Sequence, residues 1–71
     1  MSFGQIGFEL GMAVSDYNNG IVKNFDTIIK YTMLYISEVK RGITNKIIKE
    51  EDLGEFYIVI GQAWASIHQR E

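Results

Sequence analysis

The sequence predicts an all-α protein of about three helices in a single domain, residues 1–71. Three segments, 2–18, 25–41 and 51–69, carry apolar residues three and four positions apart, the spacing of one helix face. Proline is absent, which suits a helical protein with few enforced turns. Apolar residues make up 46% of the chain, too many for a disordered protein. We therefore expect a small helical bundle.

Residues 2–18 are expected to form the first helix, although a strand is the competing interpretation. The apolar residues at helical spacing are Phe3, Ile6, Leu10, Ala13, Val14 and Tyr17. Apolar residues also alternate over 5–14, and Asn19-Gly20 would then be a hairpin turn. A strand would leave Gly7, Glu9 and Gly11 together on one face with little to pack. We therefore favour a helix.

Residues 25–41 are expected to form the second helix. Asn24 or Asp26 offers an N-cap, Arg41 suits the negative C-terminal end of the helix dipole, and Gly42 fits the position after the helix. The apolar arc comprises Phe25, Ile28, Ile29, Thr32, Tyr35, Ile36 and Val39. The pattern of residues 43–49 fits a loop, a short strand or an extra helical turn, and this choice stays open.

Residues 51–69 show the clearest helical pattern. The acidic run Glu50, Glu51 and Asp52 favours a helix N-terminus. Apolar residues then keep near-heptad spacing at Leu53, Tyr57, Ile60, Trp64 and Ile67, and this stripe is widened by Phe56, Val59 and Ala63.

Five of the seven glycines lie inside the expected helices, where each costs about 0.5–1 kcal/mol relative to alanine. They form two strips, each beside the apolar arc of its helix. Close approach of another helix would offset their cost, either between the first and third helices of one chain or across the two-fold axis of a homodimer. The residues assigned to this contact are Gly4, Gly7, Gly11, Gly54, Gly61 and Trp64.

The apolar arcs exceed what three short helices can hide, and chains of this length often depend on oligomerisation. Phe8 and Ile58 lie beyond the glycine strips, and Leu34 lies on the polar side of its helix. These three residues are the expected surface for a partner.

No set of catalytic residues is visible, so we expect a non-enzymatic protein without metal or cofactor. There is no cysteine, and the one histidine, His68, is interpreted as a solvated residue near a helix end. Asp52 and Glu55 stand three apart on one helix face, a spacing typical of magnesium–phosphate sites. With Glu9 they define the competing hypothesis, a magnesium-dependent nucleotide pyrophosphohydrolase; acids at a helix start are the favoured interpretation.

A basic stretch defines a second alternative, contact with nucleic acid. Its residues are Lys40, Arg41, Lys46 and Lys49. Tyr31 and Tyr35 precede it, but three acids follow at once, and the net charge is −2. A solvated charged linker is the favoured interpretation, so nucleic acid is not an expected partner.

The chain shows neither a membrane span nor a signal peptide. Its longest uncharged run, 56–69, is shorter than the ~18 residues that a span needs, and the N-terminus has no basic region. We therefore expect a cytoplasmic protein with no membrane partner.

The pattern Phe3-x-x-Ile6-Gly7-x-Glu9-x-Gly11-x-x-Val14, followed by Asn18 and Phe25, resembles the opening of small helical proteins encoded by phages of Gram-positive bacteria. Those proteins are similar to the MazG-like and nucleotide-modification-associated groups. The resemblance covers about the first 35 residues. Tyr17-Asn18 stands where the family has Lys-Asn, and the family's Tyr-Gly-Asp-Ser stretch is absent. The resemblance implies a phage or prophage origin and a helical scaffold.

The sequence thus favours a protein-binding module that acts as a homodimer. Its most concrete version is a phage-encoded modulator or inhibitor of a host protein, such as a defence or replication factor, in the host cytoplasm.

Overall fold

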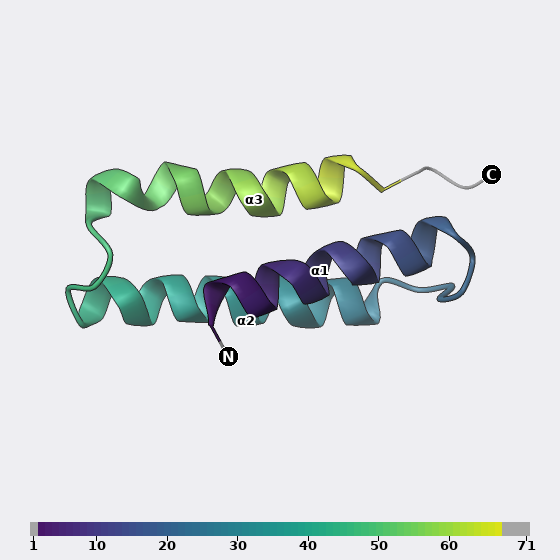
Figure 1. Ribbon diagram of the computed structural model, residues 1–71, viewed down its shortest axis with the longest axis horizontal. Helices are drawn as coiled ribbons and strands as arrows, with labels where there is room; N and C mark the ends of the chain where they lie inside the picture. The colour runs from purple at the N-terminus through teal and green to yellow at the C-terminus, as the bar shows by residue number, and fades with distance from the viewer. Residues whose placement is uncertain (1, 68–71) are drawn as a thin grey trace.

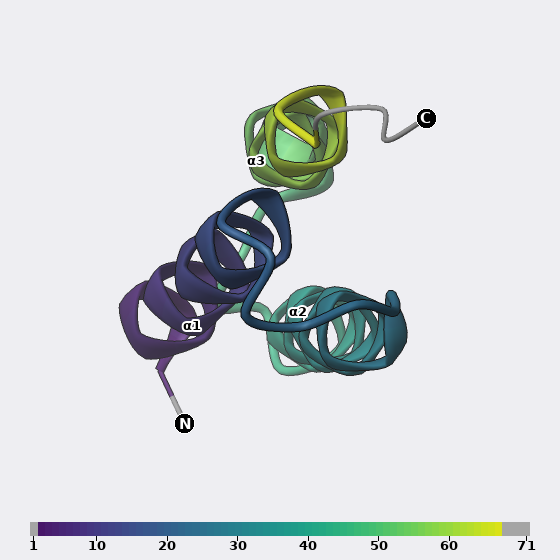
Figure 2. The same cartoon turned by 90° about the vertical axis from the view of Figure 1, so that its right-hand side faces the viewer.

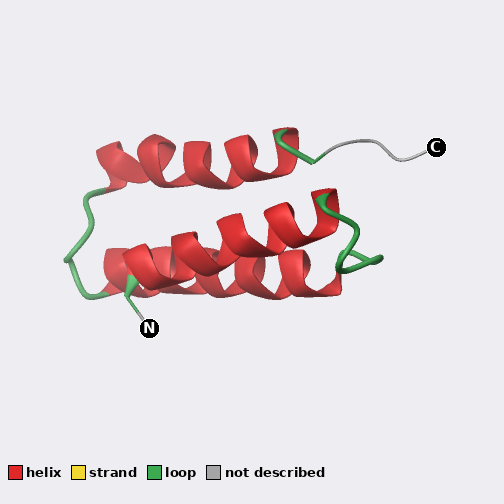
Figure 3. Cartoon of the chain, turned by 45° about the vertical axis from the view of Figure 1, so that its right-hand side comes forward, coloured by secondary structure: helices red, strands yellow, loops and turns green. Residues whose placement is uncertain are grey.

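The computed structural model describes residues 2–67, which fold into three α-helices: α1 (Phe3–Asn18), α2 (Asp26–Thr44) and α3 (Leu53–Ala65). A short 3₁₀ turn, η1 (Glu50–Asp52), leads into α3. Successive helices run antiparallel along the long axis, which is horizontal in Figure 1. Seen along that axis, the three helices lie at the corners of a triangle (Figure 2). Residues 2–67 contain no strand (Figure 3). The predicted all-α fold is therefore confirmed, and the strand interpretation of 5–14 is wrong.

Side-chain and backbone caps define both ends of α1. Ser2 Oγ accepts the backbone N–H of Gln5 at 3.2 Å, an N-cap bond that satisfies one free donor of the first turn. At the C-terminal end, Gly20 has a φ of 78°, the left-handed conformation that glycine adopts without strain. The N–H groups of Ile21 and Gly20 bond to the carbonyls of Asp16 at 2.9 Å and Tyr17 at 3.1 Å. This pair of bonds is a Schellman motif, which ends the helix.

The start of α2 matches the prediction in part. Asn24 Oδ1 accepts the backbone N–H of Asp26 at 3.1 Å, so the asparagine satisfies a free donor of the first turn. The N-cap residue itself is Phe25, and Asp26 is already helical.

The C-terminal end of α2 differs from the prediction, because the helix continues through Gly42 to Thr44. A second Schellman motif ends it, with Lys46 in the left-handed position at a φ of 59°. The Ile47 N–H bonds to the Gly42 carbonyl at 2.8 Å, and the Lys46 N–H bonds to the Ile43 carbonyl at 3.0 Å. Residues 43–44 are thus the last helical residues of α2, and 45–49 form a loop.

The predicted end of the third helix is also wrong. The helix ends at Ala65, and Ser66 is its C-cap. Ser66 Oγ donates to the Gln62 carbonyl at 2.7 Å, and the Ser66 N–H bonds to the same carbonyl at 3.0 Å. These bonds close the last turn. His68 and Gln69, which were expected near or at the helix end, lie outside the described residues.

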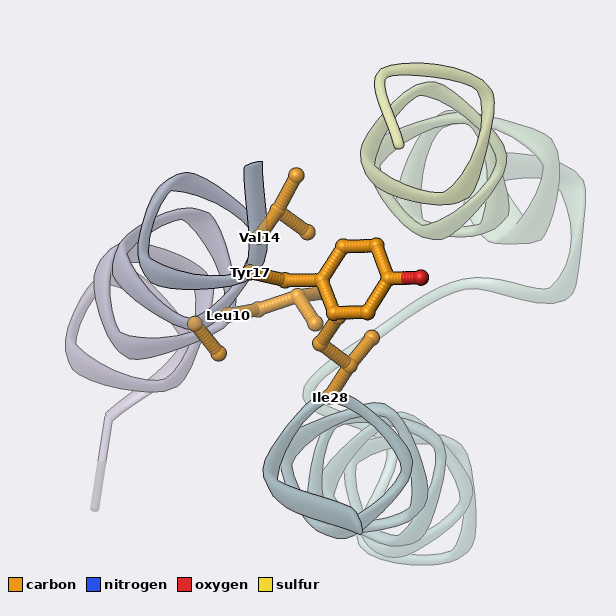
Figure 4. Packing of buried hydrophobic residues seen from close by; sticks show 5 residues of the cluster. Leu10, Val14, Tyr17 and Ile28 are labelled. Atoms are coloured by element: carbon orange, nitrogen blue, oxygen red, sulfur yellow. The ribbon is translucent and has the colours of Figure 1, made fainter. Parts of the chain in front are cut away.

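The core lies between α1 and α2. The buried apolar residues among 2–67 come from these two helices and one loop position: Ile6, Leu10, Ala13, Val14, Tyr17, Ile28, Tyr35, Val39 and Ile48. Figure 4 shows the Tyr17 ring above Ile28, in the space among the three helices. The predicted inward face of α1 is therefore confirmed. In α2, Ile28, Tyr35 and Val39 are buried as expected.

Candidate protein-binding surface

Helix α3 lies against the α1–α2 pair without burying any of its own residues. The structure describes all of Leu53–Ala65, and none of these residues is buried. Its inward residues Phe56, Ile60 and Ala63 are only half-buried where they pack on the core. Glu55 is the only charged residue of the helix. Between 37% and 56% of the surface stays exposed at four large apolar residues of α3: Tyr57, Ile58, Val59 and Trp64.

Polar and aromatic contacts hold the C-terminal half of α3 in place. Trp64 Nε1 donates to Thr32 Oγ1 at 3.0 Å, and the Trp64 ring centroid lies 6.0 Å from that of Phe25. Asn18 Nδ2 donates to the Ser66 carbonyl at 2.9 Å. Trp64, which the sequence assigned to a helix–helix or dimer contact, thus contacts α2 of its own chain and remains 37% exposed.

The outer face of α3 carries its glycines. A Cβ built at Gly54 or Gly61 would meet no atom within 4 Å, so neither glycine lies against another helix of the same chain. Ile58, the predicted partner residue beside them, is 56% exposed. The space above these glycines is open.

The glycine strip of α1 is similar. Gly4 and Gly11 have no neighbouring atom within 4 Å of a built Cβ, and at Gly7 the nearest atom, Cε2 of Tyr35, is at an ordinary contact distance of 3.9 Å. The interpretation that the two strips pack together inside one chain is therefore wrong. The alternative, contact across a dimer axis, stays a prediction. Phe8, beside the strip, is 64% exposed.

Helix α2 also presents apolar side chains to solvent. Ile29 and the N-cap residue Phe25 were expected in its apolar arc but are 44% and 40% exposed. Leu34, a predicted partner residue, lies at 37% exposure. An open groove of about 270 Å³ runs along the same helix and is lined by Met33, Ile36, Ser37 and Lys40. Sequence reasoning missed this groove, since Met33 stood only at the edge of the predicted arc.

The basic stretch is partly neutralised by its neighbours. Arg41 Nη1 lies 3.4 Å from Glu38 Oε1, and Lys49 Nζ lies 4.0 Å from Glu51 Oε1. Tyr35, which was considered as an aromatic neighbour of this stretch, is buried, and burial raises the pKa of its hydroxyl above the usual value of 10.0. Its ring is therefore not available to stack on a base.

The hypothesis of a magnesium site gains no support from the geometry. Over residues 2–67, the structure brings together no group of three Asp, Glu or His side chains that could hold a metal ion. Glu9, Asp52 and Glu55 thus do not form the cluster that the hypothesis requires. Within the same range, none of the helices has the length and apolar character needed to cross a bilayer.

The fold and its surface define a class: a small three-helix protein whose third helix is incompletely covered. Comparison with family models, curated proteins and solved structures gave no match. The resemblance in the first 35 residues therefore stays an expectation.

Proposed function

We propose that this chain is a protein-binding module that assembles as a homodimer and acts by binding another protein. The observation that supports this function is α3, an apolar helix with no buried residue. Contiguous exposed apolar surface on a small protein is typical of protein–protein contact. The resemblance of the first 35 residues supports the more specific proposal of a phage-encoded modulator or inhibitor of a host protein in the host cytoplasm.

The energetics favour a covered α3. Full burial of an isoleucine contributes about 1.5–3 kcal/mol, and Ile58 keeps 56% of its surface in water. Covering this side chain would thus contribute on the order of 1 kcal/mol. Covering five exposed apolar side chains on α2 and α3 would together contribute about 5 kcal/mol; these are Ile29, Met33, Tyr57, Ile58 and Trp64. That gain opposes the cost of association, about 4–15 kcal/mol in lost translational and rotational freedom, so it supports weak self-association.

Sedimentation across the micromolar concentration range tests the homodimer. We expect a species of twice the 8.1 kDa chain mass, with a melting temperature that rises with protein concentration. A monomer at every concentration, with a cooperative melt that does not depend on concentration, would rule out the homodimer.

A further inference from the structure

We infer that a second copy of this chain covers the outer face of α3, with the two α3 helices antiparallel and Ile58 of each copy seated above Gly61 of the other. This inference rests on the proposed function, because it specifies how the same homodimer is built. It follows from the spacing, charge and area of this face.

The spacing of the outer residues matches a helix–helix seam. Gly54, Ile58, Gly61 and Ala65 follow one another at intervals of four, three and four residues, the repeat of two helices packed side by side. The seam carries no charge. It also has one large side chain among three small ones, so the partner surface must supply space for Ile58.

A two-fold antiparallel pairing satisfies that requirement with the same surface on both copies. With the axis between positions 58 and 61, Ile58 faces the partner's Gly61, and Gly54 faces the partner's Ala65. A parallel pairing would set Ile58 against Ile58 and leave glycine facing glycine. The bulky pair would then hold the helices apart and leave voids beside it. Large against small fills the seam in the antiparallel pairing alone.

The charges at the start of α3 favour the same orientation. Its N-terminal end carries three acidic residues, Glu50, Glu51 and Asp52. Lys49 Nζ lies 4.0 Å from Glu51 Oε1 and partly neutralises this cluster. Parallel helices would bring two such acidic clusters side by side. Antiparallel helices place them about 20 Å apart, the length of a 13-residue helix, which exceeds the ~8 Å screening length of physiological salt.

The exposed area near the seam also points to this face. Tyr57 and Trp64 flank the seam at 40% and 37% exposure, and Phe25 adjoins Trp64 at 40%. These three rings leave roughly 200–250 Å² uncovered, given about 150–250 Å² for a buried aromatic side chain. Ile58 lies in the seam itself, and the exposed Ile29 and Met33 add a similar area where the second copy also extends over α2.

The total is therefore about 500 Å² per copy from side chains alone, toward the ~800 Å² per partner of a stable interface. The outer face of α1 offers only Phe8 and Met12 as exposed large apolar side chains. A second copy is thus better accommodated on α3 and the adjoining side of α2, and an area below that of a stable interface predicts a weak dimer.

Disulfide trapping tests the orientation directly, since the chain has no cysteine of its own. In the antiparallel pairing, the substitutions Gly54→Cys in one copy and Ala65→Cys in the other face each other. Position 54 of one copy lies about 16 Å along the helix axis from position 54 of the second copy, and the same holds for position 65. A disulfide needs Cα atoms within about 7 Å. Oxidation of a mixture of the two variants should give at least tenfold more cross-linked dimer than oxidation of either variant alone. Gly11→Cys, another exposed glycine with free space, is the matched control and should not cross-link.

The outcomes separate this inference from the proposed function. Self-cross-linking of Gly54→Cys and of Ala65→Cys would show a parallel pairing, and self-cross-linking of Gly11→Cys would place the axis on α1. Either result, or no cross-link in a chain that sediments as a dimer, overturns the inference and leaves the homodimer standing. A chain that is monomeric throughout removes the homodimer itself.

A second pair of variants tests the seat of Ile58 without oxidation. Gly61→Leu should weaken dimerisation at least tenfold, because the new side chain occupies the space for the partner's Ile58. Helical content should be retained, since nothing within the chain approaches a Cβ at that position. Gly11→Leu makes the same change in equally open space on α1 and should leave the dimer unchanged. Equal dimerisation of Gly61→Leu and the unmodified chain would contradict the inference.

Discussion

Gly42→Ala should destabilise the protein even though alanine is the better helix former. In a helix interior, alanine is favoured over glycine by about 1 kcal/mol. A Cβ at Gly42, however, would lie 2.5 Å from Cδ1 and 2.8 Å from Cγ1 of Ile48, well inside the ~3.5 Å of a normal carbon contact. Ile48 is 8% exposed, and its N–H bonds to the Gly42 carbonyl at 3.0 Å, so it has little freedom to move.

The expected magnitude follows from these opposing effects. Overpacking of this kind costs about 1–3 kcal/mol, which outweighs the propensity gain and leaves a net loss of about 1 kcal/mol. For a chain of this length, that loss lowers the melting temperature by about 4–8 °C. Thermal unfolding followed by circular dichroism, at one fixed protein concentration, measures it.

Two further variants show whether Ile48 is the cause. Gly11→Ala, where nothing lies within 4 Å of the new Cβ, should raise stability by about 0.5–1 kcal/mol. Ile48→Val removes Cδ1 and costs about 0.5–1.5 kcal/mol alone, but combined with Gly42→Ala it should cost less than the sum of the two single changes. If Gly42→Ala instead stabilises the chain as much as Gly11→Ala does, the reasoning about this close approach is refuted.

Three other predictions concern the loops and the tertiary contacts. Lys46→Gly relieves a left-handed non-glycine residue and should raise stability by about 1 kcal/mol, while Gly20→Ala, at the equivalent position after α1, should lower it by a similar amount; urea unfolding measures both. Thr32→Val removes the acceptor of the Trp64 hydrogen bond and should lower the free energy of unfolding by about 0.5–1.5 kcal/mol. Thr27→Val, the same change at an exposed position, should leave it unchanged, and equal effects of the two variants would mean that the hydrogen bond contributes nothing. The pKa of Tyr35 is raised by burial, so the folded state holds this proton more tightly and its stability should fall as the pH rises above 10; Tyr35→Phe should make that alkaline fall shallower, and unchanged steepness would contradict the assignment.

The fold of the α1–α2 pair could be predicted because its sequence pattern and its packing agree. Ile6, Leu10 and Ala13 recur at helical spacing and are all buried, whereas a strand would place Ala13 on the opposite face from the other two. Asn19-Gly20 was recognised in the sequence as a possible turn, and the structure places Gly20 in the left-handed conformation that ends α1.

The end of α2 could not be predicted, because a residue other than glycine takes the left-handed position that ends the helix. Gly42 was predicted to stop the helix, but it lies inside the helix, where the side chain of Ile48 packs against it. Lys46 takes the left-handed position that favours glycine. Propensity alone does not reveal this arrangement, since it does not report how the side chain of Ile48 packs against Gly42.

The sequence predicted that an exposed apolar surface exists, but not that most of it lies on α3 and the adjoining side of α2. The excess of apolar side chains was evident from the sequence, and Phe8 and Ile58 are exposed as expected. Residues 51–69 nevertheless show the clearest helical pattern of the chain, and this pattern predicted an inward stripe. Helix α3 buries none of its residues, and periodicity within one helix does not report how closely the other helices cover it.

Because α3 buries none of its residues, the free energy of local unfolding should be lower in α3 than in α1 and α2. Helices α1 and α2 share the buried core, so their amide hydrogens should exchange with solvent only when the whole chain unfolds. Helix α3 buries none of its residues, so we expect it to detach while that pair stays intact and its amides to exchange by this less costly route. Any partner that covers α3 closes this route, so the local order of the last helix should depend on association.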